Sequence, residues 1–436
     1  MKFYNRHKEL ELLQANLKRS VDVACFQAVI GRRRVGKTSL LMESVKGARY
    51  LYLFVARKNE QLLCQQFQQD AEQMLGLRIF GTISSFKDLF EQLLIFSTQH
   101  HFTLIIDEFQ EFDNINPSIF SDIQHLWDQY KAQAKINLIV CGSVYSLMIK
   151  IFEHSKEPLF GRLTAKMIVQ PFKVDVIKEI LSDYNPDFQP EDLLCLYMIS
   201  GGVAKYIELL MDSGAFTKVQ MLDFITRADS PFLGEGKDIL ITEFGKEYGT
   251  YFSVLQLIAS GKNTQSEIDS VISKNTGSYL SNLETNYSLI VRNKPIFSKP
   301  NSRNTRWSLR DNYLRFWFRF IYPHQSLIEV GRLDLLREFI DRDYEQYSGL
   351  LLEQYFREKM SLEGRITKIG SYWDSKGENE IDIVALNQLD KVAILGEVKR
   401  NPKKISLGLL EHKANTLKKE LASFEFQLIG LSLEDM

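Results

Sequence analysis

The sequence lacks the features of a disulfide-stabilised, zinc-binding or membrane protein. Its four cysteines, in 436 residues, form no CxxC pair and no Cys/His set at zinc spacing. This excludes a disulfide framework and a structural zinc site, and it favours a reducing cytoplasm. No run of about 18 apolar residues occurs, so we expect no membrane span. The opening residues also lack the apolar core of a secretory signal. A formal net charge of −1 excludes an overall positive field, so any contact with nucleic acid requires local basic patches.

The sequence does contain a P-loop between a predicted strand and a predicted helix. Residues 31–38 read G-x-x-x-x-G-K-T, after an apolar strand pattern over 22–30 and before a helix over 37–47. This is the context that the motif requires. Backbone N–H groups should converge on phosphate oxygens, Lys37 should reach the β- and γ-phosphates, and the Thr38 hydroxyl should ligate Mg²⁺. The predicted ATP-binding residues of the loop are Gly31, Arg32, Arg33, Arg34, Val35, Gly36, Lys37, Thr38 and Ser39.

Four more apolar runs predict the rest of a parallel sheet. They alternate with helical patterns and cover 49–55, 102–108, 135–143 and 165–169, as expected when both faces of a parallel sheet are buried. Two acids end the run 102–108, and Asp107 is predicted to hold Mg²⁺ as the Walker B acid. Glu108 is placed to polarise the water that attacks the γ-phosphate, or it only caps a strand end. Ser143 either senses the γ-phosphate or serves as a helix N-cap.

These motifs together resemble a known family. GRRRVGKTSLL (31–41), LIIDEFQEF (104–112), CGS (141–143) and EPLFGR (157–162) are similar to the archaeal-type ATPases, an AAA+/STAND-related P-loop family found in archaea and bacteria. The turn GGVAKY at 201–206 resembles one in the family's helical lid, with Ala204 where proline is usual. The resemblance implies ATP and Mg²⁺ as cofactors and ATP hydrolysis as the activity. It makes Arg162 a candidate phosphate contact, in cis or across the subunit boundary of a homo-oligomer; the alternative is a surface salt bridge.

The segment after residue 246 changes character. Three helical patterns precede two extended pieces, 289–292 and 306–309, an order typical of a winged helix. The third helix could enter a major groove, although many such domains only contact partner proteins. The aromatic run 313–320 is more typical of a packed core than of a base-stacking platform. The cations that could touch DNA phosphates are Lys294, Lys299, Arg303 and Arg306.

A second chemical site is predicted near the C-terminus. Asp382 and Glu397 belong to two apolar strand patterns that could be neighbours, and Glu397 and Lys399 project from one face. The acid pair can hold Mg²⁺ or Mn²⁺, while the lysine can orient water and neutralise a pentavalent phosphate. With Glu353 as a helical acid, this set resembles the PD-(D/E)xK nuclease-like fold, although Ile381 stands where proline is usual. The basic cluster 399–404 could steer a DNA backbone or be a solvated strand end.

The sequence therefore predicts an α/β protein built on a P-loop NTPase parallel sheet. Its predicted function is a Mg²⁺-dependent ATPase whose nucleotide state gates a C-terminal metal-dependent DNA nuclease. The alternative is an ATP-switched regulator or scaffold that binds DNA or protein, with a catalytically silent nuclease-like domain. A small-molecule kinase is disfavoured by Glu108 and by the appended domains. The predicted parts are the ATPase core (1–171), a helical lid and connector (172–245), a winged helix (246–312), a helical linker (313–345) and a restriction-endonuclease-like α/β domain (346–436).

Overall fold

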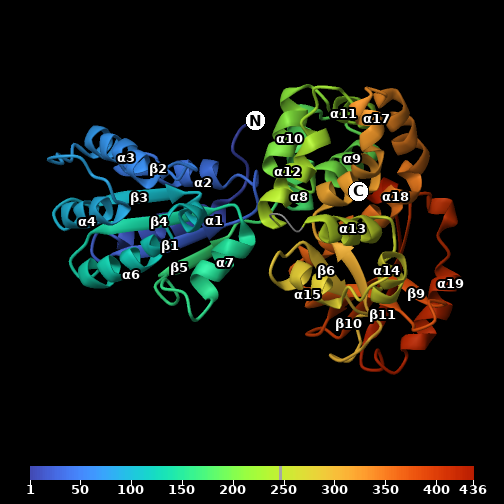
Figure 1. Ribbon diagram of the computed structural model, residues 1–436. Coiled ribbons are helices and arrows are strands. Elements are labelled where there is room, and N and C mark those ends of the chain that lie inside the picture. The colour runs from blue at the N-terminus through green and yellow to red at the C-terminus, as the bar shows by residue number, and fades with distance from the viewer. Residues whose placement is uncertain (245–247) are drawn as a thin grey trace. The chain divides into compact units, whose positions relative to one another are not determined.

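A computed structural model describes residues 1–244 and 248–436 of the chain (Figure 1). It contains two compact units, residues 5–170 and residues 1–4 with 171–436. The predicted boundary between lid and winged helix, at 245–246, lies outside the described residues. No described helix combines the length and the apolar character needed to cross a membrane.

The first unit contains the parallel sheet that the apolar runs predicted. Its strand order is β2-β3-β4-β1-β5, and every neighbouring pair is parallel. Strand β4 lies between the P-loop strand β1 and the acid-bearing strand β3, so the residues after all three strands meet at one edge. The strands are β1 (Cys25–Ile30), β2 (Tyr50–Phe54), β3 (Phe102–Asp107), β4 (Ile136–Gly142) and β5 (Ala165–Ile168).

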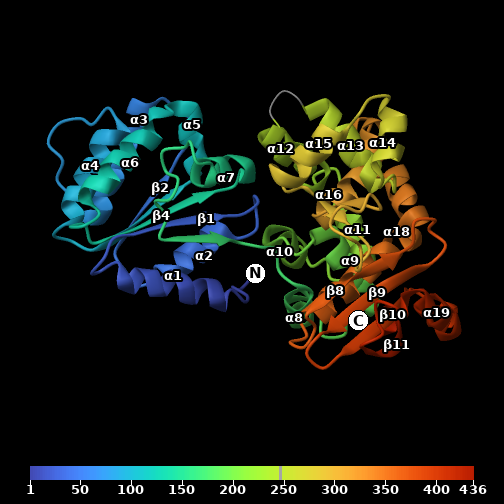
Figure 2. The same ribbon diagram turned by 90° about the horizontal axis from the view of Figure 1, so that it is seen from below.

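Helices cover both faces of this sheet (Figure 2). Val29, Ile105 and Ile139 point to the face covered by α1 and α2, whereas Phe26 and Leu104 point to the other face. This alternation follows from the period of two along a strand. One face carries α1 (His7–Arg19) and α2 (Lys37–Ser44). The other carries α3 (Glu60–Leu75), α4 (Phe86–Ser97), α6 (Ser118–Tyr130) and α7 (Tyr145–Glu153); the short η1 (Phe109–Glu111) and α5 (Phe112–Ile115) follow β3.

A helical layer forms the centre of the second unit. Helix α9 is buried along almost its whole length and contacts α16 and α18. Trp317 donates from Nε1 to the Leu233 carbonyl at 2.9 Å, and it is buried with Phe316 and Phe318. The prediction that the aromatic run forms core is therefore confirmed. The elements are α8 (Val174–Tyr184), α9 (Pro190–Ser200), α10 (Ala204–Asp212), α11 (Lys218–Ile225), α12 (Phe232–Phe244), α16 (Asn312–Phe316), a π-helical turn η3 (Trp317–Ile321), η4 (Tyr322–His324), α17 (Gln325–Glu329) and α18 (Leu333–Ser361).

Three helices and an antiparallel hairpin lie between α12 and α16 in the sequence. They are α13 (Tyr248–Ala259), α14 (Gln265–Ile272), α15 (Gly277–Thr285), β6 (Ile290–Asn293) and β7 (Arg306–Leu309). We call the hairpin and its connecting loop, residues 290–309, the wing.

The C-terminal segment forms a four-stranded sheet in the order β11-β10-β9-β8. Strand β9 pairs antiparallel with β8 on one side and with β10 on the other, whereas β10 and β11 pair in parallel. Helix α18 contacts one face, and α19 packs on the other through Leu410 and Ala414. The strands are β8 (Lys368–Trp373), β9 (Glu380–Asn387), β10 (Val392–Lys399) and β11 (Glu425–Ser432). The helices are η5 (Pro402–Lys404), α19 (Leu407–Ala414), η6 (Asn415–Leu417) and η7 (Leu433–Asp435).

Candidate nucleotide and carboxylate sites

The predicted P-loop turns sharply between β1 and α2. Arg34 and Gly36 adopt left-handed backbone conformations, with φ of 70° and 95°. A Cβ on Gly31 would lie 2.8 Å from the Val169 carbonyl oxygen, so only glycine fits there. The Lys37 ammonium lies inside the loop, where it donates to the carbonyls of Gly31 at 2.7 Å and Arg32 at 3.0 Å. The loop therefore concentrates backbone N–H groups and one buried positive charge at the start of α2.

The predicted Walker B acids meet the P-loop as expected from the sheet. The Thr38 hydroxyl donates to Asp107 Oδ2 at 3.0 Å, and the Ser143 hydroxyl donates to Glu108 Oε2 at 2.8 Å. Glu108 has a left-handed φ of 54°, unusual for a residue with a side chain. Such strain costs on the order of 1–3 kcal/mol and is concentrated at functional sites. Ser143 contacts the predicted catalytic acid, as the phosphate- or water-sensing alternative requires.

Two further side chains fix these acids and were missed in the sequence. The Tyr52 hydroxyl donates to Asp107 Oδ2 at 2.8 Å, and burial together with Asp107 raises the pKa of Tyr52, so it stays a donor. Gln110 is fully buried and donates to Glu108 Oε2. A Cβ on Gly142 would collide with the amide oxygen of Gln110, so the glycine at this position leaves the room that the amide occupies. Tyr52 lies in an ordinary apolar strand pattern, which carries no sign of this role.

Arg6 is the other residue that the sequence did not reveal. It is 7% exposed, and it donates to the carbonyls of Val35 at 3.3 Å and Gln170 at 2.6 Å. It also pairs with Glu9 at 3.0 Å, while burial lowers the pKa of its guanidinium. Arg6 therefore joins the segment before α1 to the P-loop and to the chain leaving β5. The opening residues matter because they position the loop.

The structure does not place Arg162 at the P-loop of its own chain. Thr164 N donates to the Phe26 carbonyl near the amino end of β1, whereas the P-loop follows Ile30 at the carboxyl end. At about 3.3 Å per residue, these points lie about 13 Å apart along the strand. Arg162 instead pairs with Asp128 at 3.2 Å. Within the described chain Arg162 therefore forms a surface salt bridge, and its phosphate contact, in cis or across a subunit boundary, stays a prediction.

The predicted C-terminal site residues do come together. Asp382 on β9 and Glu397 on β10 flank the Lys399 ammonium, which lies 3.2 Å from Asp382 Oδ2 and 3.6 Å from Glu397 Oε1. Val398 N also donates to Asp382 Oδ2 at 2.8 Å, and Ser406 N donates to Glu397 Oε2 at 3.0 Å. Burial opposes the charge of Lys399, but Asp382 and Glu397 outweigh it and raise its pKa. The ammonium therefore offsets the charge of both acids.

Glu353 on α18 belongs to the same cluster. Burial, followed by the Asp382 charge, raises the pKa of Glu353 to about 7. Arg357 partly compensates: it lies 3.6 Å from Glu353 and donates to the Asp382 carbonyl at 2.7 Å. A carboxyl group that titrates near neutrality beside a second acid is a candidate functional group.

Two cations predicted to face DNA are engaged within the chain. Arg306 pairs with Glu380 at 2.7 Å and lies over the Trp373 ring at 4.6 Å. Arg400, from the basic cluster 399–404, pairs with Glu191 on α9 at 2.6 Å. Arg306 and Arg400 each already neutralise an acid, and a DNA-phosphate contact by either residue stays a prediction.

The oxygen donors at both sites suit a hard divalent cation. Thr38 and Asp107 supply a hydroxyl and a carboxylate, and Asp382 with Glu397 supplies two carboxylates. Mg²⁺ is commonly held by one or two carboxylates with water and phosphate as the other ligands. Within the described ranges, no three His, Cys, Asp or Glu side chains form a metal-binding group. The residues present therefore fit a cation shared with substrate, not an all-protein cage.

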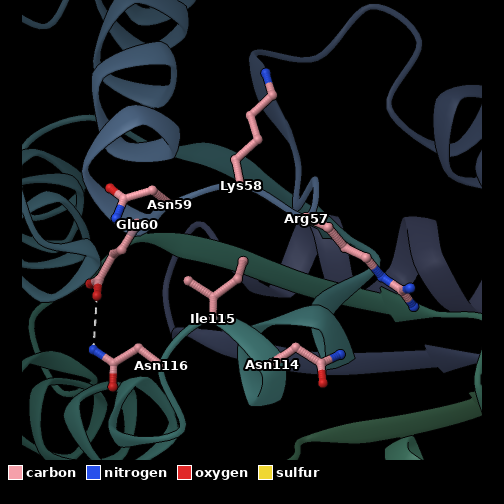
Figure 3. A pocket seen from close by; sticks show the side chains of 7 residues that line it. All are labelled: Arg57, Lys58, Asn59, Glu60, Asn114, Ile115 and Asn116. Atoms are coloured by element: carbon pink, nitrogen blue, oxygen red, sulfur yellow. Dashed lines mark hydrogen bonds between the residues drawn. The ribbon is translucent and has the colours of Figure 1, made fainter. Parts of the chain in front are cut away.

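A cavity of 540 Å³ lies at the carboxyl end of β2 (Figure 3). Its amides are already used: Asn116 donates to Glu60 at 2.8 Å, Asn59 accepts from Gln61 N at 2.9 Å, and Asn114 donates to Glu111 at 3.1 Å. We assign it no ligand.

Comparisons with known proteins match both halves of the chain. A family profile described as an ATPase domain predominantly from Archaea matches residues 3–210, and one described as archaea bacterial proteins of unknown function matches 317–409. An uncharacterized protein of Methanocaldococcus jannaschii is 33% identical over 411 residues, covering 91% of this chain and 87% of that protein.

Solved structures are similar at lower identity. A Walker-type ATPase of Pyrococcus abyssi has a TM-score of 0.53 at 17% identity, over 72% of this chain and 96% of that chain. The ORC2 protein of Aeropyrum pernix, solved in ADPNP–ADP complexes, has a TM-score of 0.47 at 15% identity, over 77% and 95%. The Pyrococcus likeness shows a shared fold. With the full-length archaeal relative and the matched ATPase domain, the chain belongs to the archaeal-type ATPase family, as a member with a C-terminal region of unknown function.

Proposed function

We propose that this ATPase-domain protein hydrolyses ATP through Glu108, and that its nucleotide state gates a metal-dependent DNA nuclease formed by Glu353, Asp382, Glu397 and Lys399. The observation that carries the proposal is the pair of hydrogen bonds from Thr38 to Asp107 and from Ser143 to Glu108. They join both predicted catalytic acids to the neighbouring strand ends at one edge of the sheet.

The residues divide the work at the nucleotide site. Lys37 neutralises charge on the β- and γ-phosphates, and the backbone N–H groups of residues 31–38 bind the remaining phosphate oxygens. Ser143 and Gln110 orient the Glu108 carboxylate, which accepts a proton from the attacking water. Mg²⁺, when bound by Thr38 and Asp107, supplies further neutralisation of phosphate charge. Arg162 acts only if a second copy of the chain brings it to the phosphates.

The C-terminal site contains the groups needed for phosphodiester hydrolysis. Asp382 and Glu397 would hold Mg²⁺ or Mn²⁺. The metal ion would stabilise the negative charge on the pentavalent phosphate. Lys399 is positioned between these acids to orient a water molecule and to oppose the negative charge that develops. Glu353 supplies a carboxyl group able to exchange a proton near neutral pH.

Helix α9 supports the gating part of the proposal. At its C-terminal turn, the Gly202 carbonyl accepts from Phe172 N at 2.7 Å, and Phe172 follows the ATPase core in sequence. Near its N-terminus, Glu191 pairs with Arg400, the residue after Lys399. A movement of α9 would therefore act on the strand end that carries the lysine. ATP would bias that movement by contacting the γ-phosphate-sensing residues differently from ADP.

The second candidate is an ATP-switched scaffold that binds DNA or a partner protein without cleaving. It is favoured by the absence of a three-ligand cluster among the described carboxylates. Both candidates share the ATPase site and a location in the reducing cytoplasm, consistent with four buried free cysteines.

One experiment separates the two. Plasmid and single-stranded DNA are incubated with the full chain and Mg²⁺ or Mn²⁺, with and without ATP. Asp382→Ala and Lys399→Ala are run beside Lys419→Ala, an exposed lysine outside the basic cluster 399–404. Cleavage abolished in the first two variants and retained in the third supports the nuclease. Intact DNA under every metal condition supports the scaffold.

A further inference from the structure

A polar cavity of the second unit lies against the wing. It has a volume of 720 Å³ and is bounded by α14, α15 and residues 292–307. Three cations line it, and no Asp or Glu is among its described lining residues. Arg292 lies over the Trp307 ring at 4.6 Å and pairs with Glu284 at 3.0 Å, and Lys294 donates to the Pro300 carbonyl. Arg303 is exposed at the rim and forms no ion pair within the described chain. Hydroxyl and amide side chains supply most of the remaining lining.

The wing separates this cavity from the carboxylate cluster. Thr305 and Trp307 line the cavity, whereas Arg306 between them reaches Glu380 on the other side, as alternation along a strand requires. Glu380 is two residues from Asp382. The wing is fixed to β8 by main-chain bonding of Ile296 N to the Ser371 carbonyl at 3.0 Å, and by Trp373 Nε1 donating to Asn304 at 2.8 Å. It therefore does not project freely, as a strand that enters a minor groove would.

Helix α15 is also unsuited to reading a duplex. Its sequence, GSYLSNLET, contains no Lys or Arg, the side chains that most often contact guanine in a major groove. Its Asn282 already donates to the Tyr251 hydroxyl at 3.2 Å. The positive charge of this region is concentrated in a concave pocket, not on an exposed helix face.

We propose that this cavity binds the phosphodiester backbone of a single nucleic-acid strand, with Arg303 as its entry contact. Lys294 is the second phosphate contact, while Arg292 stays paired with Glu284. The bound nucleic acid then lies on the opposite side of the wing from Asp382 and Glu397. A single strand would then be the substrate of the proposed nuclease. Only cleavage of the bound strand rests on that proposed function; its binding does not.

The test measures binding without cleavage. Fluorescence anisotropy of a labelled oligothymidylate of about 16 nucleotides is followed in EDTA with the full chain, at low and moderate salt. Oligouridylate and a blunt duplex are the comparison probes, the first to distinguish DNA from RNA. The variants are Arg303→Ala and Arg303→Glu, with Arg365→Ala as an exposed arginine outside the cavity.

We expect Arg303→Ala to weaken binding several-fold and to reduce the salt slope by about 0.7, the effect of losing one phosphate contact on a single strand. Arg303→Glu should weaken binding further, and Arg365→Ala should bind like the unmodified chain. Absence of binding, unchanged binding by Arg303→Glu, or preference for the duplex would each overturn the inference. Binding through Arg303 without cleavage in Mn²⁺ would refute the nuclease alone, and cleavage insensitive to Arg303 would refute this inference alone.

Discussion

Replacing Glu353 by glutamine should stabilise the metal-free protein at alkaline pH. Burial of the Glu353 carboxyl, followed by the negative charge of Asp382, raises its pKa from 4.5 to about 7. A raised acid pKa means that the folded state holds the proton more tightly than the unfolded state does. Below about pH 4.5 both states are protonated, and the shift has no effect on stability. As pH rises through the window from 4.5 to 7, the free energy of unfolding decreases, and above pH 7 the full destabilisation is present.

The size of the effect follows from the shift. At about 1.4 kcal/mol per pKa unit, it corresponds to about 3 kcal/mol. The Glu353 side chain is 25% exposed, so solvent screening reduces our expectation to about 2 kcal/mol. Glutamine keeps the shape and removes the charge, so the variant should gain this amount at pH 8 and nothing near pH 4.

Thermal unfolding in EDTA across this pH range measures the prediction. The melting temperature of the Glu353→Gln protein should exceed that of the unmodified chain by about 5 °C at pH 8. The two melting temperatures should converge near pH 4. Glu338→Gln, an exposed position on the same helix, is the matched control and should track the unmodified chain. A difference that is independent of pH, or equal in both variants, would refute the electrostatic reasoning.

Three other predictions test separate parts of the molecule. Lys37→Ala should lose ATP binding measured by calorimetry, whereas Glu108→Gln should bind ATP but lose at least about 100-fold in hydrolysis rate; hydrolysis retained by both would contradict the assignment. Arg400→Ala should destabilise the second unit by about 2 kcal/mol in urea unfolding, because Glu191 loses its nearer partner and keeps Lys218 at 3.8 Å, in a site where each side chain is about a fifth exposed; adding Glu191→Gln should recover part of the loss, and no recovery would count against the pairing. Mn²⁺ should raise the melting temperature of the unmodified chain and not of an Asp382→Ala, Glu397→Ala double variant, with EDTA reversing the rise; an equal rise in both proteins would place the metal elsewhere.

Local patterns were sufficient for the parts of the sites that lie at strand ends. Continuous apolar runs identified the five parallel strands, and their carboxyl ends brought Thr38, Asp107 and Ser143 to one edge. Antiparallel pairing of β9 with β10 likewise placed Asp382 beside Lys399. In each case, the residue's position within a strand fixed its direction.

Contacts between distant segments could not be predicted in this way. Arg6 reaches partners 29 and 164 residues away, and its place in the opening residues does not predict those contacts. Arg306 looked like a phosphate contact because it follows a basic loop, but it pairs with Glu380, 74 residues further along the chain. The order of the strands, with β4 between β1 and β3, also depends on packing that no local pattern contains. Arg162 lies away from the loop because it precedes β5, which runs parallel to β1 and begins beside Gln27.

The central claim, that the nucleotide site controls the carboxylate site, is tested most directly by one rate. Cleavage of a labelled single-stranded DNA is followed in Mn²⁺ with and without ATP, by the unmodified chain and by Lys37→Ala. The account predicts that ATP changes the rate of the unmodified chain several-fold and leaves the Lys37→Ala rate unchanged. Equal rates with and without ATP in both proteins, or cleavage that persists in Asp382→Ala, would contradict it.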